Sequence, residues 1–442
     1  MLSLSGCDVS VVASTVDAGW LCGVTPDEIA QVRPRLLEFA GRMLSGLPRA
    51  DQRAKGELYL RGLLLDGRRK SMQPMAERLG VDHQGLQQFL TSSTWNYEQV
   101  RANVARWAVD VIGPDAYVVD DSGFPKDGRS SPCVARMYSG TLGKTGNCQI
   151  GVSVQVVTDH ASLAANWRLF CPESWDDTTI ADPAKAQTVR ERRARAGIPH
   201  RVRHREKWRL ALDMLDQMTD GWGLPRLPVT ADAGYGDATG FREGLQERGY
   251  AYVAAVNPTT SAHPEHARPA LVPTTGRGRP PKPKYREKPS NLRDLALAAG
   301  PDACVQVTWR HGTRKTSTNP TAAMTSRFLA IKVRPANRDI PRNPDGALPT
   351  RWLLAEWPLD AAEPTDYWLS NIDDDAPLAE LVRLAKIRWR IEHDYRELKT
   401  GLGLDHFEGR SFTGWHRHVT LACLAQAFCT LLRLDPKVPA PA

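Results

Sequence analysis

The sequence contains few cysteines, and no two of them form a C-x-x-C pair. The eight cysteines are scattered over 442 residues, at Cys7, Cys22, Cys133, Cys148, Cys171, Cys304, Cys423 and Cys429. This spacing argues against a zinc ribbon and a disulfide scaffold, and it fits a reducing compartment. The sequence also lacks an apolar run of roughly 18 residues, and its N-terminus lacks a basic segment followed by a long apolar one. We therefore expect a soluble, cytoplasmic protein without a membrane partner.

Positive charge is in excess. The chain has 58 Lys and Arg against 50 Asp and Glu, a formal net charge of +8, and a sequence pI near 9.1. Such a balance points to a polyanionic partner without identifying it. The hydrophobic share of 41% is close to the average of soluble globular proteins, so a large core can form. At roughly 150 residues per domain, the length suggests about three domains.

Hydrophobic periodicity changes along the first half of the chain. Residues 25–110 carry apolar side chains at three- and four-residue spacing, which predicts a helical N-terminal domain over residues 1–110. Residues 111–256 show a different pattern, which predicts the order strand, strand, strand, helix, strand, helix, strand. Strands that mix with helices in this order indicate an α/β domain.

The second half of the chain interrupts and then completes this domain. Residues 257–370 are rich in proline and contain a basic tract and a β meander, so we expect a β-rich inserted subdomain. Residues 371–435 are expected to return to the α/β domain as helices, the stronger of them running from about 377 to 399. The tail over residues 436–442 is expected to be disordered.

Three acidic positions are tied to defined elements of this pattern. Asp120 and Asp121 end the first predicted strand, Asp232 ends the fourth, and Glu392 lies in the late helix. Carboxylates from neighbouring strand ends and from a covering helix can meet at one point, as two Mg²⁺ ions about 4 Å apart require for displacement at phosphorus. We expect Asp120, Asp232 and Glu392 to be catalytic ligands of Mg²⁺, which Mn²⁺ can replace.

The angular positions of residues around the late helix predict which of its charged side chains share a face. At about 100° per residue, an apolar stripe contains Leu384, Ile387, Ile391 and Leu398. Arg388, Glu392 and Lys399 fall on a neighbouring stripe, and Glu397 falls on the far side. The phase predicts that Glu392, and not Glu397, shares a site with the strand carboxylates, beside two cations that hold phosphates.

The spacing Arg388-x3-Glu392-x6-Lys399 resembles the signature of bacterial insertion-sequence transposases of the DDE class. Ala385 stands where that signature has a tyrosine. The segments 120–126 and 230–236 resemble the two aspartate motifs of this family, and the resemblance covers roughly residues 55–430. It implies an RNase H-like (retroviral-integrase-like) mixed-sheet α/β core with a β-rich insertion. It also implies Mg²⁺-dependent cleavage and strand transfer by a homodimer at terminal inverted repeats.

Asp120 and Asp121 remain alternatives for the first aspartate. Successive strand residues face opposite sides, so only one of them points into the site. The first strands of RNase H-like proteins commonly read Asp-x-Ser or Asp-x-Thr, which favours Asp120 with Ser122, and Asp121 is the alternative metal ligand.

Basic residues along the chain are candidates for DNA contact. They are Arg388, Lys399, Arg396, Lys126, Arg190, Arg192, Arg193, Arg195, Arg201, Arg277 and Arg279. The basic run 190–209 is interpreted as a phosphate-binding segment, with a solvated face as the alternative. Residues 277–282 resemble an AT-hook or form a flexible basic linker, and residues 75–90 have the pattern of a helix-turn-helix.

The leading hypothesis is a cut-and-paste DNA transposase whose partners are double-stranded inverted-repeat DNA and target DNA in the bacterial nucleoid. One alternative is an RNase H-like structure-specific nuclease, which would use the same carboxylates without paired DNA ends. The other alternative is a non-catalytic, transposase-derived DNA-binding regulator, and the presence of all three carboxylates argues against it.

Overall fold

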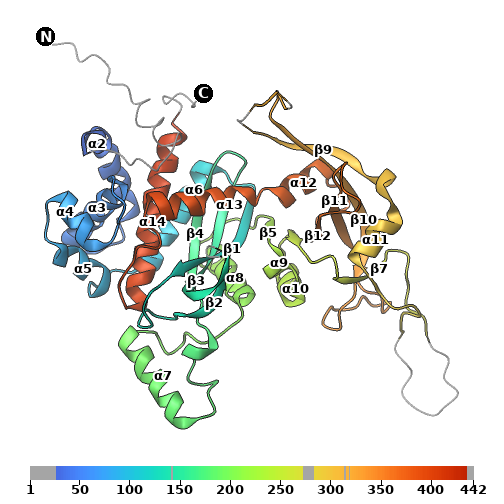
Figure 1. Ribbon diagram of the computed structural model, residues 1–442, viewed down its shortest axis with the longest axis horizontal. Coiled ribbons are helices and arrows are strands. Elements are labelled where there is room, and N and C mark those ends of the chain that lie inside the picture. Colours follow the sequence, from blue (N-terminus) through green and yellow to red (C-terminus); the bar gives the residue numbers. More distant parts are fainter. Residues whose placement is uncertain (1–25, 141–142, 272–282, 313–314, 318, 436–442) are drawn as a thin grey trace. The chain divides into compact units, whose positions relative to one another are not determined.

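Two compact units make up the described part of the computed structural model, which Figure 1 shows. The described residues are 26–140, 143–271, 283–312, 315–317 and 319–435. Unit 1 contains the described residues up to Pro114, residues 121–224 and those from Arg390 onward; unit 2 contains Asp115–Asp120 and Pro225–Trp389. The domain limits expected at residues 110, 256 and 370 do not coincide with the limits of these units. Arg277, Arg279 and the tail 436–442 lie outside the described residues.

The described N-terminal residues of unit 1 form five helices, in line with their periodicity. They are α2 (Pro26–Met43), α3 (Ala50–Leu64), α4 (Met72–Leu79), α5 (His83–Thr91) and α6 (Tyr97–Ile112). Gly80 ends α4 with a φ of +66°, and Asp82 caps α5 by accepting a hydrogen bond from the Gln84 amide at 3.1 Å. A left-handed glycine followed by an N-cap aspartate makes a tight turn between two helices.

Helix α14 (Phe412–Arg433) is buried on nearly all sides in unit 1. It packs against α3, α5, α6 and strand β4 (Ser162–Leu169), so its polar side chains bond inside the protein. His418 Nδ1 lies 2.8 Å from the Tyr59 hydroxyl, and His418 Nε2 lies 2.8 Å from the Gly403 carbonyl. Burial lowers the pKa of His418 to about 4, so its ring stays neutral near pH 7.

Two buried arginines connect the N-terminal helices to the rest of unit 1. Arg101 of α6 donates hydrogen bonds to the Trp167 carbonyl at 2.8 Å and to the Thr420 hydroxyl at 2.9 Å. Arg417 of α14 donates to the carbonyls of Leu90 and Trp95, each at 2.9 Å. Because these guanidinium groups are satisfied only when the segments are packed together, the N-terminal helices belong to the same compact unit.

The strands of unit 1 form an antiparallel sheet. It contains β2 (Ala135–Ser139), β3 (Lys144–Val157) and β4. The Lys126 amide donates to the Asn147 carbonyl at 3.0 Å, so the C-terminal end of β1 (Ala116–Pro125) lies beside β3. Helix α8 (Lys207–Asp216) packs on β3 and β4, and α7 (Pro183–Ala196) projects from unit 1 (Figure 1).

The sheet of unit 2 combines parallel and antiparallel pairs. The N-terminal half of β1 is parallel to β5 (Val229–Ala231), which is parallel to β6 (Tyr252–Ala255). The strands that follow are β12 (Asp366–Ser370), β11 (Arg351–Glu356), β10 (Ala323–Pro335), β7 (Ser261–Pro264) and β8 (Ser290–Asn291), with β9 (Val305–His311) also paired to β10. Because β12 bonds directly to β6, the predicted β-rich insertion continues the sheet of β5 and β6.

Alternate residues of this sheet pack against helices on opposite faces. Leu354 and Trp368 contact the apolar side chains of α12 (Leu378–Lys386), and Leu353 and Leu369 contact those of α11 (Leu292–Ala299). This two-residue alternation is the pattern of a sheet covered on both faces. The chain is therefore a mixed α/β protein with a mixed sheet, as predicted. None of the described helices has the length and apolarity needed to cross a membrane.

The prediction of one continuous helix from about 377 to 399 is wrong. Helix α12 ends at Lys386, a turn follows at Ile387 and Arg388, and α13 (Trp389–Arg396) runs into a π-helical turn at Glu397–Gly401. A turn and a π-helical segment each change the rotation per residue. The common stripe drawn through Arg388, Glu392 and Lys399 at a constant phase therefore does not exist.

Glu397 also differs from its expected position on an outer face. Its side chain is 3% exposed and forms an ion pair with Arg433 of α14. The neighbouring Asp394 is buried as well, and burial raises the pKa of its carboxyl. The inner surface of α13 is therefore acidic, and α14 supplies the charge that compensates it.

We predict that Glu397→Ala lowers the stability of unit 1 by about 3 kcal/mol, because it removes the buried carboxylate that pairs with Arg433. Urea unfolding followed by far-ultraviolet circular dichroism measures this loss. Glu38→Ala, at an exposed position of α2, is the control and should leave the midpoint unchanged. Equal midpoints for the two variants would contradict the prediction.

Candidate active site between β1 and β5

Strands β1 and β5 carry the first two predicted carboxylates to the same level of the sheet of unit 2. The parallel register pairs Tyr117 with Val229, Val118 with Thr230 and Val119 with Ala231. Asp120 and Asp232 each come directly after the last of these pairs. The prediction that the first strand ends at Asp120 and Asp121 is wrong, because β1 continues to Pro125; only its pairing with β5 ends at Val119. Since equivalent residues of parallel strands in register point to the same side, this pairing brings the two side chains together.

Arg388 contacts both carboxylates. Its Nη2 donates to Asp120 Oδ2 at 3.3 Å and lies 3.5 Å from Asp232 Oδ2. The side chain of Asp120 is 10% exposed and that of Asp232 is 34% exposed, so water screens this charge cluster only in part. Arg388 was predicted to bind DNA; in this structure its guanidinium compensates the two aspartates.

The turn that carries Arg388 is held by its neighbours in unit 2. Lys386 forms an ion pair with Glu356 of β11, and the Arg310 guanidinium lies 3.2 Å from the ring centre of Trp389. Arg383 of α12 donates to Asp115 at 2.9 Å, directly before β1. These contacts fix the end of α12 against the sheet and so position Arg388 at Asp120 and Asp232.

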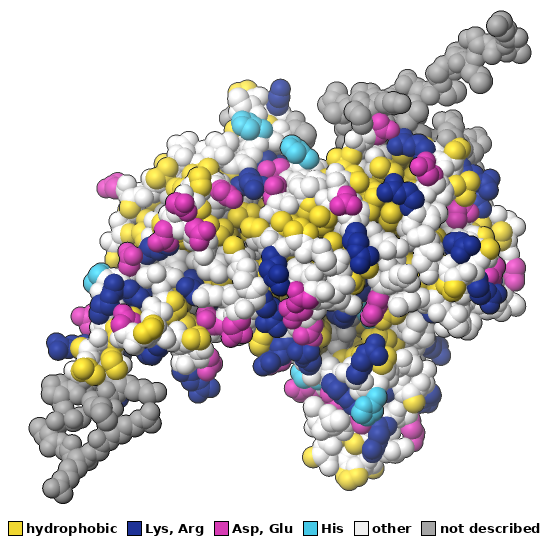
Figure 2. Space-filling view, turned by 180° about the vertical axis from the view of Figure 1, so that it is seen from behind, with side chains coloured by type: hydrophobic (Ala, Val, Ile, Leu, Met, Phe, Trp, Pro, Cys, Tyr) yellow, Lys and Arg dark blue, Asp and Glu magenta, His cyan; other side chains and the backbone are white. Residues whose placement is uncertain are grey.

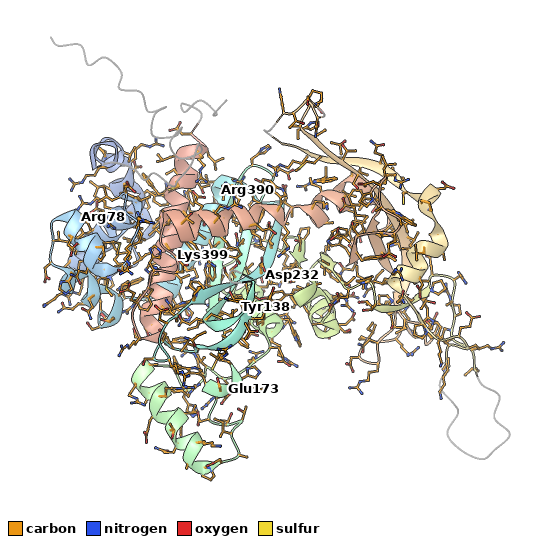
Figure 3. All side chains as sticks on the ribbon, viewed as in Figure 1. Arg78, Tyr138, Glu173, Asp232, Arg390 and Lys399 are labelled. Carbon is orange, nitrogen blue, oxygen red and sulfur yellow. The ribbon has the colours of Figure 1, made fainter. Side chains whose placement is uncertain are left out.

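Asp232, labelled in Figure 3, has a carboxylate oxygen without a partner among the described residues. The residue is the N-cap of α9 (Ala233–Gly236), where aspartate side chains normally accept amide hydrogen bonds. Here the side chain makes no capping bond, and its buried Oδ1 accepts no hydrogen bond. A buried carboxylate oxygen of this kind is a suitable ligand for a hard divalent cation.

The two glycines after Asp232 are required by close contacts. A Cβ at Gly234 would lie 3.1 Å from Asp232 Oδ1, so a side chain there would crowd the carboxylate. A Cβ at Gly236 would lie 1.9 Å from the Ala255 carbonyl oxygen of β6. The Gly-x-Gly sequence therefore lets the turn pack on β6 while the carboxylate stays accessible.

Asp121 points to a different partner from Asp120. Its Oδ2 lies 2.5 Å from the Lys207 ammonium at the start of α8, and both residues belong to unit 1. No sequence signal links these two residues, which are 86 positions apart. Asp121 is thus in an ion pair with a lysine, whereas Asp120 shares an arginine with Asp232.

Lys399, labelled in Figure 3, lies within unit 1 near the continuation of β1. Its ammonium donates to the Gly123 carbonyl at 2.8 Å, and burial lowers the pKa of the group. Lys126 is similar, because its ammonium donates to the Phe407 carbonyl at 2.7 Å and burial lowers its pKa. Both predicted DNA-binding lysines therefore already hold backbone carbonyls.

Glu392 and Arg396 are exposed on α13 in unit 1. Asp120 and Asp232 belong to unit 2, so the convergence of all three carboxylates stays a prediction. In and directly after α13, the exposed His393 and the buried Asp394 and Glu397 have ligand atoms within 4.8 Å of one another. Glu397 is paired with Arg433, so an arginine already compensates the charge of this group.

The basic run 190–209 separates into exposed and structural arginines. Arg190, Arg195 and Arg201 are exposed. Arg192 stacks on Trp175 at 3.8 Å, and the buried Arg193 donates to the Trp175 carbonyl at 2.6 Å. The expectation that Arg193 contacts phosphate is wrong for this conformation, because its guanidinium is inside the protein. On the face shown in Figure 2, Lys and Arg are interspersed with Asp and Glu.

Comparison with known proteins assigns the family. The model of the DDE superfamily endonucleases matches residues 42–316. The "Probable transposase for insertion sequence element IS701" of Microchaete diplosiphon is 35% identical over 96 residues, which is 21% of this chain and 25% of that relative. The matched segment thus spans a quarter of the relative. Since the family match covers more than half of the chain, this protein belongs to the DDE superfamily of endonucleases.

Proposed function

We propose that this protein is a DNA transposase that cleaves DNA at the terminal inverted repeats of an insertion sequence and transfers the freed strands to target DNA. The observation that carries the proposal is that Asp120 and Asp232 each follow the last paired residue of parallel strands β1 and β5, with Asp232 Oδ1 left without a hydrogen bond from the described residues. A purely structural aspartate at an N-cap would use that oxygen to cap the helix.

Enzymes of the DDE superfamily generally depend on divalent metal ions. Asp120 and Asp232 offer the carboxylate oxygens that Mg²⁺ prefers, and Mn²⁺ accepts the same donors. Bound to them, Mg²⁺ would activate water or a DNA 3′-hydroxyl for attack at phosphorus. Arg388 can donate to a phosphate oxygen with the same guanidinium that now compensates the aspartates.

Glu392 is proposed as the third ligand because the chain keeps it close to Arg388. They are four positions apart, so their Cα atoms lie at most roughly 14 Å from each other. Arg388 in turn contacts Asp120 and Asp232. A similar argument applies to Lys399, which donates to the carbonyl of Gly123, three residues after Asp120. We propose that Lys399 positions a phosphate next to the scissile bond, and that the active assembly on paired DNA ends is a homodimer.

We predict that Asp120→Asn, Asp232→Asn and Glu392→Gln each abolish Mg²⁺-dependent cleavage of an inverted-repeat duplex, because each removes a charged metal ligand. DNA binding, measured by fluorescence anisotropy in EDTA, should stay within about threefold of the wild type, since phosphate contacts remain. Asp121→Asn is the matched control and should retain cleavage. Near wild-type cleavage by Asp232→Asn would refute the site. Cleavage without any preference for repeat ends would favour a structure-specific nuclease.

We predict that Lys399→Ala slows end cleavage by roughly 10²-fold, since a positioning cation lowers the barrier by orienting the phosphate. Single-turnover kinetics at saturating DNA measure this loss. Lys144→Ala removes an exposed lysine at the start of β3 and should cleave like the wild type. Glu397 is unsuitable as a control because it is buried and paired. Equal rates for Lys399→Ala and Lys144→Ala would exclude the positioning role.

We predict that replacing Arg190, Arg195 and Arg201 together by alanine weakens binding to repeat and scrambled duplexes alike. Each lost phosphate contact should lower the slope of log K against log salt concentration by about 0.9. Anisotropy titrations between 50 and 200 mM salt give this slope, at concentrations where phosphate contacts dominate binding. An unchanged slope would identify the exposed side of α7 as a solvated face.

A further inference from the structure

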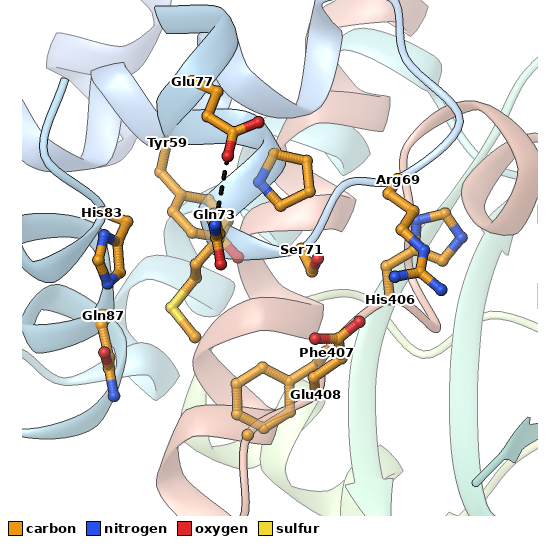
Figure 4. A pocket seen from close by; sticks show the side chains of 13 residues that line it. Tyr59, Arg69, Ser71, Gln73, Glu77, His83, Gln87, His406, Phe407 and Glu408 are labelled. Carbon is orange, nitrogen blue, oxygen red and sulfur yellow. Dashed lines mark hydrogen bonds between the residues drawn. The ribbon is translucent and has the colours of Figure 1, made fainter. Parts of the chain in front are cut away.

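Two adjoining hollows form one groove on unit 1. Their volumes are about 500 and 590 Å³, and both are lined by Arg69, Ser71, His406 and Glu408. The groove runs between the α3–α4 loop, the segment 405–410 and the loop 125–131 that follows β1. Figure 4 shows its first part, with Arg69 and His406 on one side and His83 and Gln87 of α5 on the other.

Two buried or half-buried lysines hold the walls of this groove together. The Lys70 amide donates to His406 Nδ1 at 3.0 Å, and its ammonium donates to the Leu63 carbonyl at 2.9 Å. The Lys126 ammonium donates to the carbonyls of Phe407 and Asp405 at 2.7 and 3.3 Å. At Gly403, a Cβ would lie 2.3 Å from Lys70 Cβ, so the two loops approach closely. The groove is therefore formed before any ligand binds.

Three arginines line the groove without a partner among the described residues. Arg68, Arg69 and Arg410 are exposed, and none of their guanidinium groups forms a hydrogen bond or ion pair with a described residue. Elsewhere in the described chain, exposed arginines such as Arg49 and Arg205 pair with an aspartate. The groove also contains four acidic residues, Glu77, Asp127, Asp405 and Glu408, so positive and negative side chains both line it.

The start of α4 adds partial positive charge beside Arg69. Ser71 is its N-cap, yet the Ser71 side chain makes no capping bond, and the first turn contains no acidic residue. The amide groups at a helix N-terminus carry partial positive charge and attract anions. Guanidinium groups bind phosphate through two parallel hydrogen bonds, so three unpaired arginines beside this helix end suit a chain of phosphates.

We propose that this groove binds the phosphodiester backbone of DNA through Arg68, Arg69 and Arg410. The proposal deepens the proposed function and rests on it, since the DNA is taken to be the substrate of the carboxylate site. The loop 125–131 follows directly on β1, which carries Asp120, and α5 lies at the other end of the groove. The groove thus links the segment after the catalytic strand to the candidate helix-turn-helix, and it contacts DNA independently of base sequence.

The test compares a groove variant with a matched control. In the groove variant Arg68, Arg69 and Arg410 are replaced by alanine; in the control Arg33, Arg42 and Arg49, exposed on or beside α2, are replaced. Anisotropy titrations in EDTA use a labelled inverted-repeat duplex and a scrambled duplex at 50–200 mM salt. For the groove variant we expect the salt slope to fall by about 2.7, which is about 0.9 for each of three contacts. A variant with lysine at all three positions should have the wild-type salt slope, because lysine keeps the positive charge.

Equal slopes for the groove variant and the control would overturn the proposal. If the triple variant fails to fold, as judged by circular dichroism, Arg68→Ala and Arg410→Ala are measured singly, each with an expected fall of about 0.9. Cleavage by the wild type is assayed separately with Mg²⁺. If the groove variant has a lower salt slope but the wild type does not cleave, the transposase proposal is refuted and the groove proposal stands. If the wild type cleaves but the groove variant has an unchanged salt slope, only the groove proposal is refuted. A wild type that binds no DNA would overturn both.

Discussion

Two carboxylates that follow the last paired residues of adjacent parallel strands need a positive charge between them, and the arrangement of unit 2 around the site depends on this need. Arg388 supplies the charge, and it can do so because α12 stops at Lys386 and the chain turns. The contacts of Arg383 with Asp115 and of Lys386 with Glu356 hold that turn. The turn after α12 carries the residue that joins the two aspartates, so the break in the helix is part of the site.

A second constraint acts on unit 1, where α14 is buried on nearly all sides although it carries His416, Arg417, His418 and Gln426. Buried polar groups require partners. Arg417 and His418 find them on the N-terminal helices and at Gly403, and Arg101 reaches back from α6 to Thr420. The helices that line the proposed phosphate groove are therefore bonded to the segment that follows α13. A ligand in the groove would contact a preformed surface rather than a separate mobile domain.

Local patterns were sufficient for several predictions and insufficient for others. The N-terminal helices, the alternating strand β3 and the position of Asp232 at a strand end follow from short-range periodicity and turn residues, whereas β1 continues past Asp120 to Pro125. The continuous late helix was predicted from α-helical phase, and the turn at Arg388 and the π-helical turn after Arg396 break that phase. Glu397 and Arg193 looked like surface charges, because a sequence does not show which charged residue has a buried partner elsewhere in the chain.

The sequence by itself determined the family motifs, the mixed α/β class and the order of the carboxylates along the chain. These features depend on residue type and on spacing over a few helical turns or strand residues, so they follow directly from the sequence. Only the tertiary structure decided that Arg388 joins Asp120 to Asp232, that Asp121 pairs with Lys207 and that β12 extends the sheet from β6. These contacts join residues from about 86 to 268 positions apart, and their formation depends on packing of the whole chain rather than on local preference.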